Sequence, residues 1–212
     1  MKIGVLQATT RKELNQTLFQ LTKAATKDQH EMINFGVFEG EDVTVSYVEV
    51  AMWLSLLVET DAVDFVVTGC SSGQGMMLAC NSLPSLSCGY LPTPQDAFLF
   101  GRINGGNVAS LPLGIGTAWQ GDLTLGYILE KLFNGDFGVG YPEEDAARKR
   151  TDTALLANLQ ARVKRSWLGL LDELDEDLLH KLLSRDNVVN HIIQEGTNTP
   201  LVQKIIEKRG TR

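Results

Sequence analysis

The stretch from Val66 to Met76 reads VVTGCSSGQGM, in which apolar and β-branched residues give way to glycine, serine and one cysteine, Cys70. In an open parallel sheet, ligands bind at the carboxyl ends of the strands, and a helix that begins there directs its N–H groups and the positive end of its dipole at one place. Oxygen anions are stabilised there, whether they belong to a phosphate, a carboxylate or an enediolate that forms during a reaction. The pattern therefore predicts an anion site beside Cys70.

Cys70 itself lies at the start of the turn, where a helix N-terminus favours the thiolate form of a cysteine. A thiolate acts as a general base or as a nucleophile. The alternative is that Cys70 is a small buried hydrophobic residue, and spacing alone does not separate the two readings. Cys80 and Cys88 stand among apolar residues, so we expect both to be inert core positions.

A dinucleotide-binding turn fits this stretch less well. The chain has only Gly73-Gln74-Gly75, without the third glycine of GxGxxG, and this stretch follows a later strand rather than the first. A GxxxxGK[ST] motif is also missing from the sequence.

Short β-rich runs alternate with helical patterns over the first two thirds of the chain. Expected strands are residues 2–6, 32–37, 64–68, 87–90 and 108–113, and expected helices are residues 11–26, 45–59, 75–81, 94–102 and 121–133. Such alternation favours a parallel sheet covered by helices on both faces. We therefore predict a Rossmann-like three-layer α/β/α domain with about five parallel strands over residues 1–135.

The remaining residues, 136–212, are expected to form a hinge loop and a helical extension. Residues 134–142 (NGDFGVGYP) contain three glycines and a proline, which mark a loop. Beyond them, residues 143–171 carry apolar side chains at helical spacing, residues 175–183 form a second helical candidate, and Thr199-Pro200 is a typical helix start.

Composition narrows the class of protein. The 212 residues carry a formal net charge of -7, so a nucleic-acid partner is not indicated. Three cysteines and three histidines (His30, His180 and His191) lack metal-ligand spacing, and an odd number of free thiols is typical of a reducing cytoplasm. The sequence shows neither a signal peptide nor an apolar run long enough for a membrane span, so we expect a cytoplasmic protein with no membrane partner.

Two groups of motifs resemble one known family. Cys70-Ser71-Ser72-Gly73-Gln74-Gly75-Met76, followed by Ala79-Cys80-Asn81, is similar to the CGTGxGM…AN signature of the ribose-5-phosphate isomerase B and galactose-6-phosphate isomerase superfamily. Asp96-Ala97-Phe98-Leu99 and Asn104-Gly105-Gly106-Asn107-Val108 resemble that family's helix and its N-D-x-N-V segment in order and spacing. The resemblance covers about residues 1–135.

The resemblance implies a role for each matching residue. Cys70 would be the base that shuttles a proton between C1 and C2, and Ser72 would replace a family threonine that assists proton transfer at a substrate oxygen. Asn104 belongs to the matching segment, and Asn107 would bind substrate hydroxyls. The enediolate oxygen would be held by the backbone N–H groups of Ser71, Gly73, Gln74 and Gly75. A thiolate base beside an anion hole needs no metal or organic cofactor.

Three departures from the family pattern bear on the substrate. Gln7-Ala8-Thr9-Thr10 stands where the family has an Asp-His/Cys-Ala-Gly motif, Ile103 replaces the ring-opening histidine, and the family's C-terminal phosphate clamp (Gly-Gly-Arg-His-x-x-Arg) is missing. Without the ring-opening histidine, the site would suit a substrate that is already open-chain. Without the phosphate clamp, it would suit a smaller anion than phosphate. The chain resembles a longer subgroup with a helical C-terminal extension that includes isomerases of 4-deoxy-L-threo-5-hexosulose uronate, and we favour that substrate.

Candidate carboxylate binders are Arg102, Arg148 and Arg150, because arginine matches a carboxylate with two hydrogen bonds. The alternative for the last two is a solvated helix face that balances the acidic residues 143–145. Tyr47 and Trp119 are candidates to line a sugar pocket, although a buried aromatic is the default.

The predicted function is therefore cofactor-free aldose–ketose isomerisation of an acidic open-chain sugar. The alternatives are a sugar-phosphate isomerase (ribose 5-phosphate or galactose 6-phosphate) with a remodelled phosphate site, a non-catalytic sugar-binding protein and, more remotely, a nucleotide-dependent oxidoreductase. Because members of the superfamily build their active sites between subunits, the resemblance also implies a homodimer or a dimer of dimers.

Overall fold

The computed structural model describes residues 1–114 and 121–210, and its centre is a five-stranded sheet in the order β2-β1-β3-β5-β4, with all neighbouring strands parallel. The strands are β1 (Lys2–Leu6), β2 (Glu31–Gly36), β3 (Phe65–Cys70), β4 (Cys88–Tyr90) and β5 (Val108–Pro112). The predicted Rossmann-like sheet of five parallel strands is confirmed.

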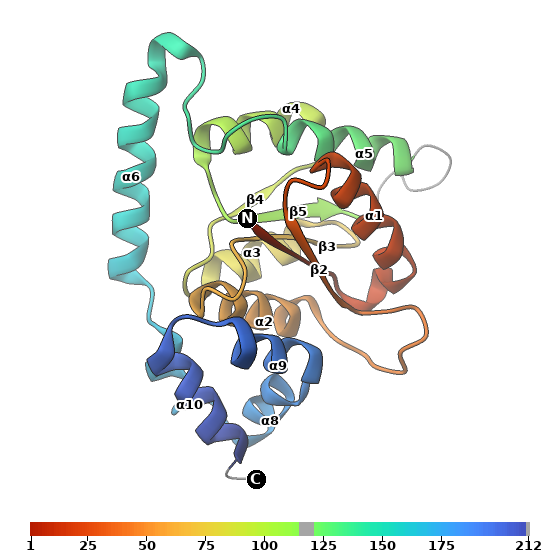
Figure 1. The fold of residues 1–212 in the computed structure, drawn as a ribbon, viewed down its shortest axis with the longest axis vertical. Helices are drawn as coiled ribbons and strands as arrows, with labels where there is room; N and C mark the ends of the chain where they lie inside the picture. Colours follow the sequence, from red (N-terminus) through yellow and green to blue (C-terminus); the bar gives the residue numbers. More distant parts are fainter. Residues whose placement is uncertain (115–120, 211–212) are drawn as a thin grey trace.

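Helices cover both faces of the sheet, as Figure 1 shows. The helices of the first part of the chain are η1 (Thr9–Leu14), α1 (Asn15–Ala25), α2 (Tyr47–Glu59), α3 (Gln74–Ser82), α4 (Pro94–Leu99), η2 (Phe100–Asn104) and α5 (Gly121–Leu132). Those of the C-terminal extension are η3 (Glu143–Asp145), α6 (Ala146–Val163), α7 (Trp167–Leu170), α8 (Glu176–Ser184), α9 (Asp186–Glu195) and α10 (Thr199–Gly210). None of the helices in the described residues is long and apolar enough to cross a membrane.

The alternation of side chains along β3 decides which way the cysteine faces. Phe65 and Val67 pack into a hydrophobic cluster with α1, α4 and α5 on one side of the sheet. Val66 and Cys70 belong to a second cluster, which contains α2 and α3, on the other side. Successive side chains of a strand point to opposite faces, so Cys70 is directed toward the α2–α3 face.

Several element boundaries differ from the sequence-based prediction. Strand β3 continues through Gly69 to Cys70, because both residues pair with β5. The helix expected from residue 11 begins with a 3₁₀ segment, and α1 starts only at Asn15. The α9 helix was not predicted as a separate element. Val48, an apolar residue in the first turn of α2, is 45% exposed.

Helix α2 is buried on two sides, because the C-terminal helices α7–α10 form a further layer outside it (Figure 1). The indole of Trp53 donates from Nε1 to the carbonyl of Leu182 at 2.8 Å, and the indole of Trp167 donates to the hydroxyl of Ser55 at 2.7 Å. Each hydrogen bond joins α2 to the extension inside an apolar layer, where an unpaired indole N–H would be costly.

The extension therefore shares a hydrophobic core with the first 135 residues, since one cluster contains residues of α2 together with Leu182, Val188 and Ile205. The expected loop at residues 134–142 is irregular, but Phe137 within it packs edge-on against Phe65, with 5.2 Å between the ring centroids. A domain boundary near residue 135 stays a prediction.

Candidate active site

The order of strands places a crevice beside Cys70. The chain runs from β1 to β2 on one side and then crosses to β3 on the other, so β1 and β3 are neighbours whose connections leave in opposite directions. Loops that separate in this way leave an opening at the carboxyl ends of the two strands, where ligands of open α/β sheets bind. Cys70, which is only 8% exposed, ends β3 at this opening and lines a cavity of about 620 Å³.

The turn after Cys70 depends on a close approach between β3 and β5. Gly73 has a φ of +75°, and a Cβ atom there would meet the Tyr90 ring at 2.8 Å and the Leu111 backbone at 2.9 Å. A Cβ on Gly69 would lie 2.4 Å from the carbonyl oxygen of Leu111. Only glycine fits either position, so the two strands fix the path of the chain into α3.

The same contact orients the peptide groups of the turn. The carbonyl oxygens of Cys70 and Ser71 accept hydrogen bonds from the N–H groups of Leu113 (3.0 Å) and Gly114 (2.8 Å), which extend β5. In a trans peptide the C=O and N–H of one unit point in opposite directions. The N–H groups of Ser71 and Ser72 therefore point away from β5, toward the β1 side where the crevice opens. The family resemblance predicted a role for the N–H group of Ser71, but for Ser72 it predicted a role only for the side chain.

Ser72 and the first turn of α3 supply further polar groups. The Oγ of Ser72 accepts a hydrogen bond from the N–H of Gln74 at 3.3 Å, which leaves the hydroxyl hydrogen of Ser72 available to a ligand. The first N–H groups of any helix, here those of Gln74 and Gly75, lack acceptors within the helix. The predicted turn residues therefore gather at one point, although the N–H of Gln74 is partly committed to Ser72.

Residues from several other segments line the cavity together with Cys70. Its walls are Ala8, Thr9, Thr10, Thr44, Val45, Ser46, Tyr47, Glu49, Cys70 and Lys181. Tyr47 was considered as a pocket residue, and its ring lies at the start of α3, 3.4 Å from the position of a Cβ on Gly75. Lys181 comes from α8 in the extension, which no local sequence signal connects with Cys70. Trp119 lies outside the described residues.

The residues that replace the family's acid–base motif are committed to structure. The Gln7 side chain is fully buried, donates to the carbonyl of Val37 at 2.9 Å and accepts from Asn15 at 2.8 Å. The hydroxyl of Thr9 accepts from the N–H of Val45 at 2.6 Å. These bonds fasten the loop after β2 to the end of β1.

The predicted asparagines lie at the other edge of the sheet. The register pairs Val66 with Val108 and Cys70 with Pro112, so Asn107 precedes β5 at its amino end, about 16 Å along the strands from Cys70. Both polar ends of the Asn107 side chain are used within the chain, by the carbonyl of Ser85 (2.7 Å) and the N–H of Ser87 (2.8 Å). Asn104 is exposed near the same edge.

Arg102 does not take the role predicted for it. Its side chain is 5% exposed and donates to the carbonyls of Asn134 (2.9 Å) and Leu132 (3.0 Å) at the end of α5. Burial lowers the pKa of its guanidinium, and the carboxylate of Asp136 acts in the opposite direction. The guanidinium thus satisfies helix C-terminal carbonyls and is not available to a substrate in the Cys70 cavity.

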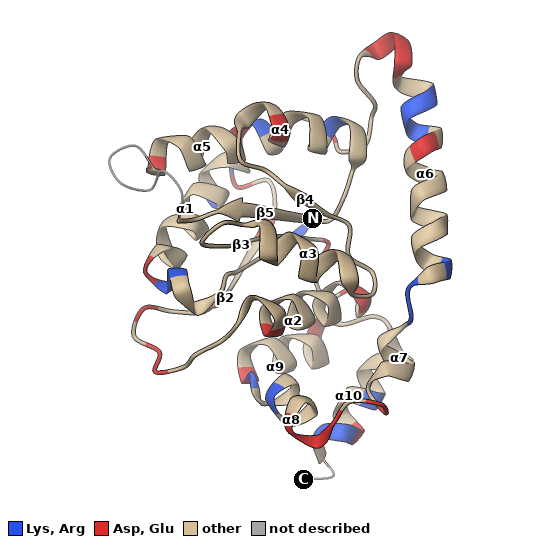
Figure 2. Cartoon of the chain, turned by 180° about the vertical axis from the view of Figure 1, so that it is seen from behind, with Lys and Arg blue, Asp and Glu red and all other residues tan. Residues whose placement is uncertain are grey.

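Arg148 and Arg150 lie at the start of α6, beside the acidic turn at residues 143–145 (Figure 2). Arg148 forms exposed ion pairs with Asp145 (3.2 Å) and Asp152 (3.3 Å), and Arg150 donates to the carbonyl of Val139 at 2.7 Å. This arrangement is the solvated helix face considered as the alternative. Within one chain, α6 lies at the end of the sheet where the strands begin (Figure 1), whereas Cys70 is the last residue of β3, at the carboxyl end.

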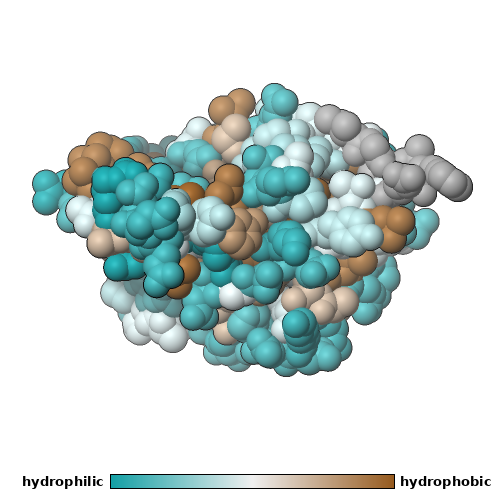
Figure 3. All heavy atoms as spheres, turned by 90° about the horizontal axis from the view of Figure 1, so that it is seen from above, coloured by the Kyte–Doolittle hydropathy of each residue, from teal (hydrophilic) through white to brown (hydrophobic). Residues whose placement is uncertain are grey.

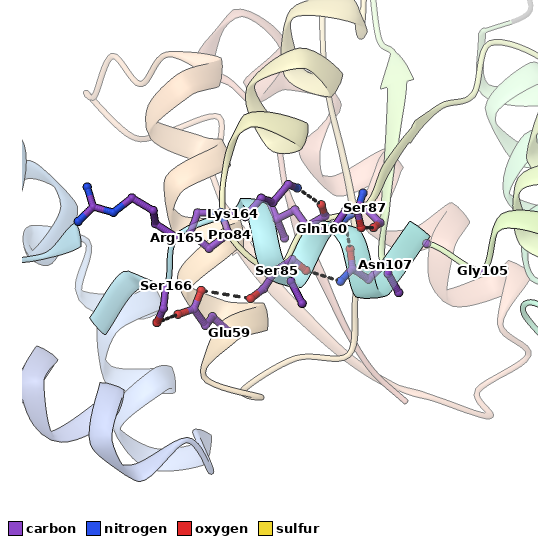
Figure 4. Close-up of a pocket in the computed structure, with 14 residues that line it drawn as sticks. Glu59, Pro84, Ser85, Ser87, Gly105, Asn107, Gln160, Lys164, Arg165 and Ser166 are labelled. Atoms are coloured by element: carbon purple, nitrogen blue, oxygen red, sulfur yellow. Dashed lines mark hydrogen bonds between the residues drawn. The ribbon is translucent and has the colours of Figure 1, made fainter. Parts of the chain in front are cut away.

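A second cavity, of about 500 Å³, lies between α6 and the body of the protein and is shown in Figure 4. Most of its polar side chains bind one another or the backbone: Ser87 donates to Gln160 at 2.6 Å, and Glu59 accepts from Ser166 at 2.6 Å. Cys70 and the turn that follows it are not among the described residues that line this cavity. It is therefore a groove of the extension rather than the candidate active site.

Cys80 and Cys88 behave as expected for inert positions. Cys80 is fully buried, and the pKa of Cys88 is strongly raised by its contact with the thiol of Cys80 and by burial, so it remains a thiol. The ring of His191 lies edge-on against Phe35, at 5.1 Å between centroids. Among the described residues, no group of three or more His, Cys, Asp or Glu side chains is placed to hold a metal ion.

Fold and crevice together define a Rossmann-like α/β protein with a candidate ligand site at the carboxyl ends of its strands. The family model for ribose/galactose isomerases matches residues 3–139, and the chain belongs to this family. A search of curated proteins finds no match. Among solved structures, a 4-deoxy-L-threo-5-hexosulose-uronate ketol-isomerase complexed with a tartrate is 32% identical, with 98% of this chain and 99% of that chain covered and a TM-score of 0.92.

Two further structures show how far the similarity extends. A ribose-5-phosphate isomerase from Vibrio parahaemolyticus is also 32% identical, with 100% of this chain and 98% of that chain covered and a TM-score of 0.89. A type B ribose 5-phosphate isomerase from Trypanosoma cruzi is 20% identical, covers only 74% of this chain with 97% of its own, and shares the fold at a TM-score of 0.57. Of these three structures, the first two match the chain over its full length, including the C-terminal extension, and the third matches only part of it. The chain is therefore most similar to the longer subgroup.

The close contact at Gly73 gives a test of the turn. Gly73→Ala is expected to cost more than about 1–2 kcal/mol of stability, because a left-handed backbone is strained for alanine and the new methyl group collides with Tyr90 and Leu111. It should also lower kcat/KM by displacing the N–H groups. Urea unfolding and an isomerase assay measure the two effects. Gly40→Ala, where a Cβ meets nothing within 4 Å, is the control; equal behaviour of the two variants would contradict the constraint.

Proposed function

We propose that the chain interconverts an aldose and a ketose by cofactor-free proton transfer, with 4-deoxy-L-threo-5-hexosulose uronate as substrate. The observation that carries the proposal is the position of Cys70, at the carboxyl end of β3, in a cavity and next to the start of α3. A base and a set of inward-pointing N–H groups at one point are what an enediolate mechanism requires.

In this mechanism the Cys70 thiolate removes the proton from C2 of the open-chain aldose and later delivers it to C1. The electron pair of the broken C–H bond forms the C1–C2 double bond of an enediolate, while the hydroxyl proton of O2 is transferred to O1. C1 is thereby reduced and C2 oxidised within one molecule. The N–H groups of Ser71, Ser72 and Gly75 stabilise the negative oxygen, and the Ser72 hydroxyl assists the transfer between oxygens.

The choice of an open-chain acid is supported by what the chain lacks at this site. Gln7 and Thr9 hold structural hydrogen bonds, and Ile103 has no acid–base group, so none of these residues opens a sugar ring. The full-length similarity to a uronate ketol-isomerase points to the same substrate. The equally identical ribose-5-phosphate isomerase supports a second candidate, a sugar phosphate.

We further propose that a second copy of the chain completes the site. The predicted asparagines lie at the edge of the sheet opposite to Cys70, so one chain does not bring them together. Apolar side chains that would suit an interface stand on α6: Leu155, Leu156, Leu159 and Val163 are between 49% and 76% exposed. Figure 3, viewed from the side of α4 and α5, shows apolar atoms at the end of the molecule where α6 lies. A stripe of this kind favours association.

A direct substrate comparison tests the favoured sugar. The protein is expected to turn over the deoxyhexosulose uronate with a kcat/KM at least about 100-fold above that for ribose 5-phosphate or galactose 6-phosphate, since the ring-opening group is missing and general acid–base assistance is worth about 10²–10⁴-fold. Steady-state assays of product formation with all three sugars measure this ratio. Good turnover of either phosphate with none of the uronate would refute the preference.

Replacement of the base tests the mechanism. Cys70→Ala is expected to reduce the incorporation of solvent deuterium at C1 or C2 by at least about 100-fold, since it removes the proton carrier. Binding of the sugar, followed by calorimetry, should survive. Cys80→Ala, a core change without access to the cavity, should retain exchange once its folding is verified. Exchange that continues at the wild-type rate in Cys70→Ala would remove Cys70 from the mechanism.

A charge on α6 tests the shared site. Leu159→Arg is expected to yield monomers in light scattering and to lower kcat/KM at least about tenfold, because a charge in an apolar interface is poorly tolerated and the partner's contribution is lost. Leu123→Arg, on the exposed face of α5, is the matched control and should change neither property. A fully active monomeric variant would place the whole site within one chain.

A further inference from the structure

The C-terminal extension contributes a charge to the cavity of Cys70. Lys181 of α8 lines both the Cys70 cavity and an adjoining cavity of about 220 Å³, whose walls also include Trp53 and Arg185. Thr44, Val45, Glu49 and Lys181 are common to both. Among the described residues that line the Cys70 cavity, Lys181 is the one with a positive charge. An acidic sugar that enters the cavity therefore meets this ammonium group.

The backbone that carries Lys181 is held firmly against the first part of the chain. The carbonyl of the next residue, Leu182, accepts the indole N–H of Trp53 at 2.8 Å. Arg185 donates to the carbonyl of Phe35 at 2.9 Å and forms an ion pair with Glu41. The position of the Lys181 Cα is therefore set by the α2–α8 contact and by the loop after β2.

The side chain of Lys181, in contrast, is free to change partners. It is 67% exposed, and its Nζ contacts Oε1 of Glu49 at 3.4 Å, a long distance for an ion pair. Exposed pairs of this kind contribute little to stability, so the exchange of one carboxylate for another costs little. A lysine on a rigid backbone with a weakly held ammonium group suits reversible binding of an anion.

The surroundings of Glu49 favour its ionised form beside this lysine. Its Oε2 accepts the N–H of Ser46 at 2.8 Å in the capping box of α2. Burial alone would raise the pKa of Glu49, but the hydrogen bonds from Ser46 and the charge of Lys181 lower it below its ordinary value. The lowered pKa favours the carboxylate form at the cavity wall, and this carboxylate repels an acidic substrate unless Lys181 compensates for its charge.

From these observations we propose that Lys181 is the residue that binds the acidic group of the sugar, by moving from Glu49 to the substrate. The proposal rests on the proposed function and names the specificity residue of that site. It replaces the arginines expected from the sequence, since Arg102 is committed to α5, and Arg148 and Arg150 lie at the other edge of the sheet within one chain. The extension then takes part in substrate recognition.

Arg11 is the competing cation. Its Nη2 lies 2.8 Å from the position that a Cβ on Gly114 would take, close to the turn after Cys70. Its Nη1 pairs with Glu13 at 3.1 Å, and Arg11 is not among the residues that line the Cys70 cavity. Substitution of each residue in turn distinguishes whether Lys181 or Arg11 binds the acidic group.

Steady-state kinetics of the full-length protein with the uronate tests the proposal. Lys181→Met should raise KM about 10- to 100-fold with kcat within about threefold, as expected for loss of a charge-assisted hydrogen bond made equally to substrate and transition state. Lys181→Arg should restore most of the affinity. Glu49→Gln, which keeps an oxygen for Ser46, should lower KM by about two- to fivefold because the competing charge is gone. Lys131→Met, on the exposed face of α5, is the control for a lost positive charge.

The outcomes separate this proposal from the proposed function. An unchanged KM in Lys181→Met, or a rise in KM in Arg11→Met instead, overturns the role of Lys181 while leaving the substrate in place. Turnover of a sugar phosphate but not of the uronate by the wild-type protein overturns the substrate, and the same KM comparison with that phosphate ester then decides the role of Lys181. If no sugar is turned over, calorimetric titration with tartrate decides the role of Lys181. Weaker binding of this dicarboxylate by Lys181→Met than by the wild-type protein supports the role, and equal binding overturns it.

Discussion

The close contact between the end of β3 and the extension of β5 is the constraint on which the candidate site depends. Glycines at positions 69 and 73 let the two backbones meet, and the carbonyls of Cys70 and Ser71 are then taken by the N–H groups of Leu113 and Gly114. Because each carbonyl points toward β5, the N–H on the other side of the same peptide points toward the crevice. The direction of these N–H groups is thus a consequence of strand pairing, and a side chain at either glycine would disturb both the pairing and that direction.

Local sequence patterns were sufficient for the sheet and for the cysteine turn. The apolar run at Phe65–Val67 and the small residues after it predicted a buried strand that leads into a helix, and the structure has that arrangement. The strand end expected at Thr68 was two residues early, because pairing with a distant strand decides where β3 ends. The α9 helix was missed although Val188, Val189 and Ile192 have helical spacing and are buried. Its pattern was short, and it follows α8 almost directly.

What the sequence could not indicate were contacts between distant segments. Arg102 matches the chemistry of a carboxylate binder, yet tertiary structure places it at the end of α5, where unpaired carbonyls attract the same guanidinium. The stripe on α6 has the spacing of a buried helix face, yet within one chain most of it remains exposed. Lys181 carries no motif at all, and only the packing of α8 on α2 brings it to Cys70. Residue type indicates what a group can bind, whereas packing decides which partner it meets.

The extension links stability to recognition in this chain. Helix α2 is apolar on two sides, so without α7–α10 a large hydrophobic surface would face water, and the extension is first a cover for that helix. The same packing fixes the Lys181 backbone beside Glu49, through Trp53 and Leu182. Truncation of the extension would therefore remove a core layer and a cation together, and loss of activity on truncation would not separate the two. Single substitutions of exposed charged residues leave the core intact. Only such variants can show whether the extension takes part in substrate recognition.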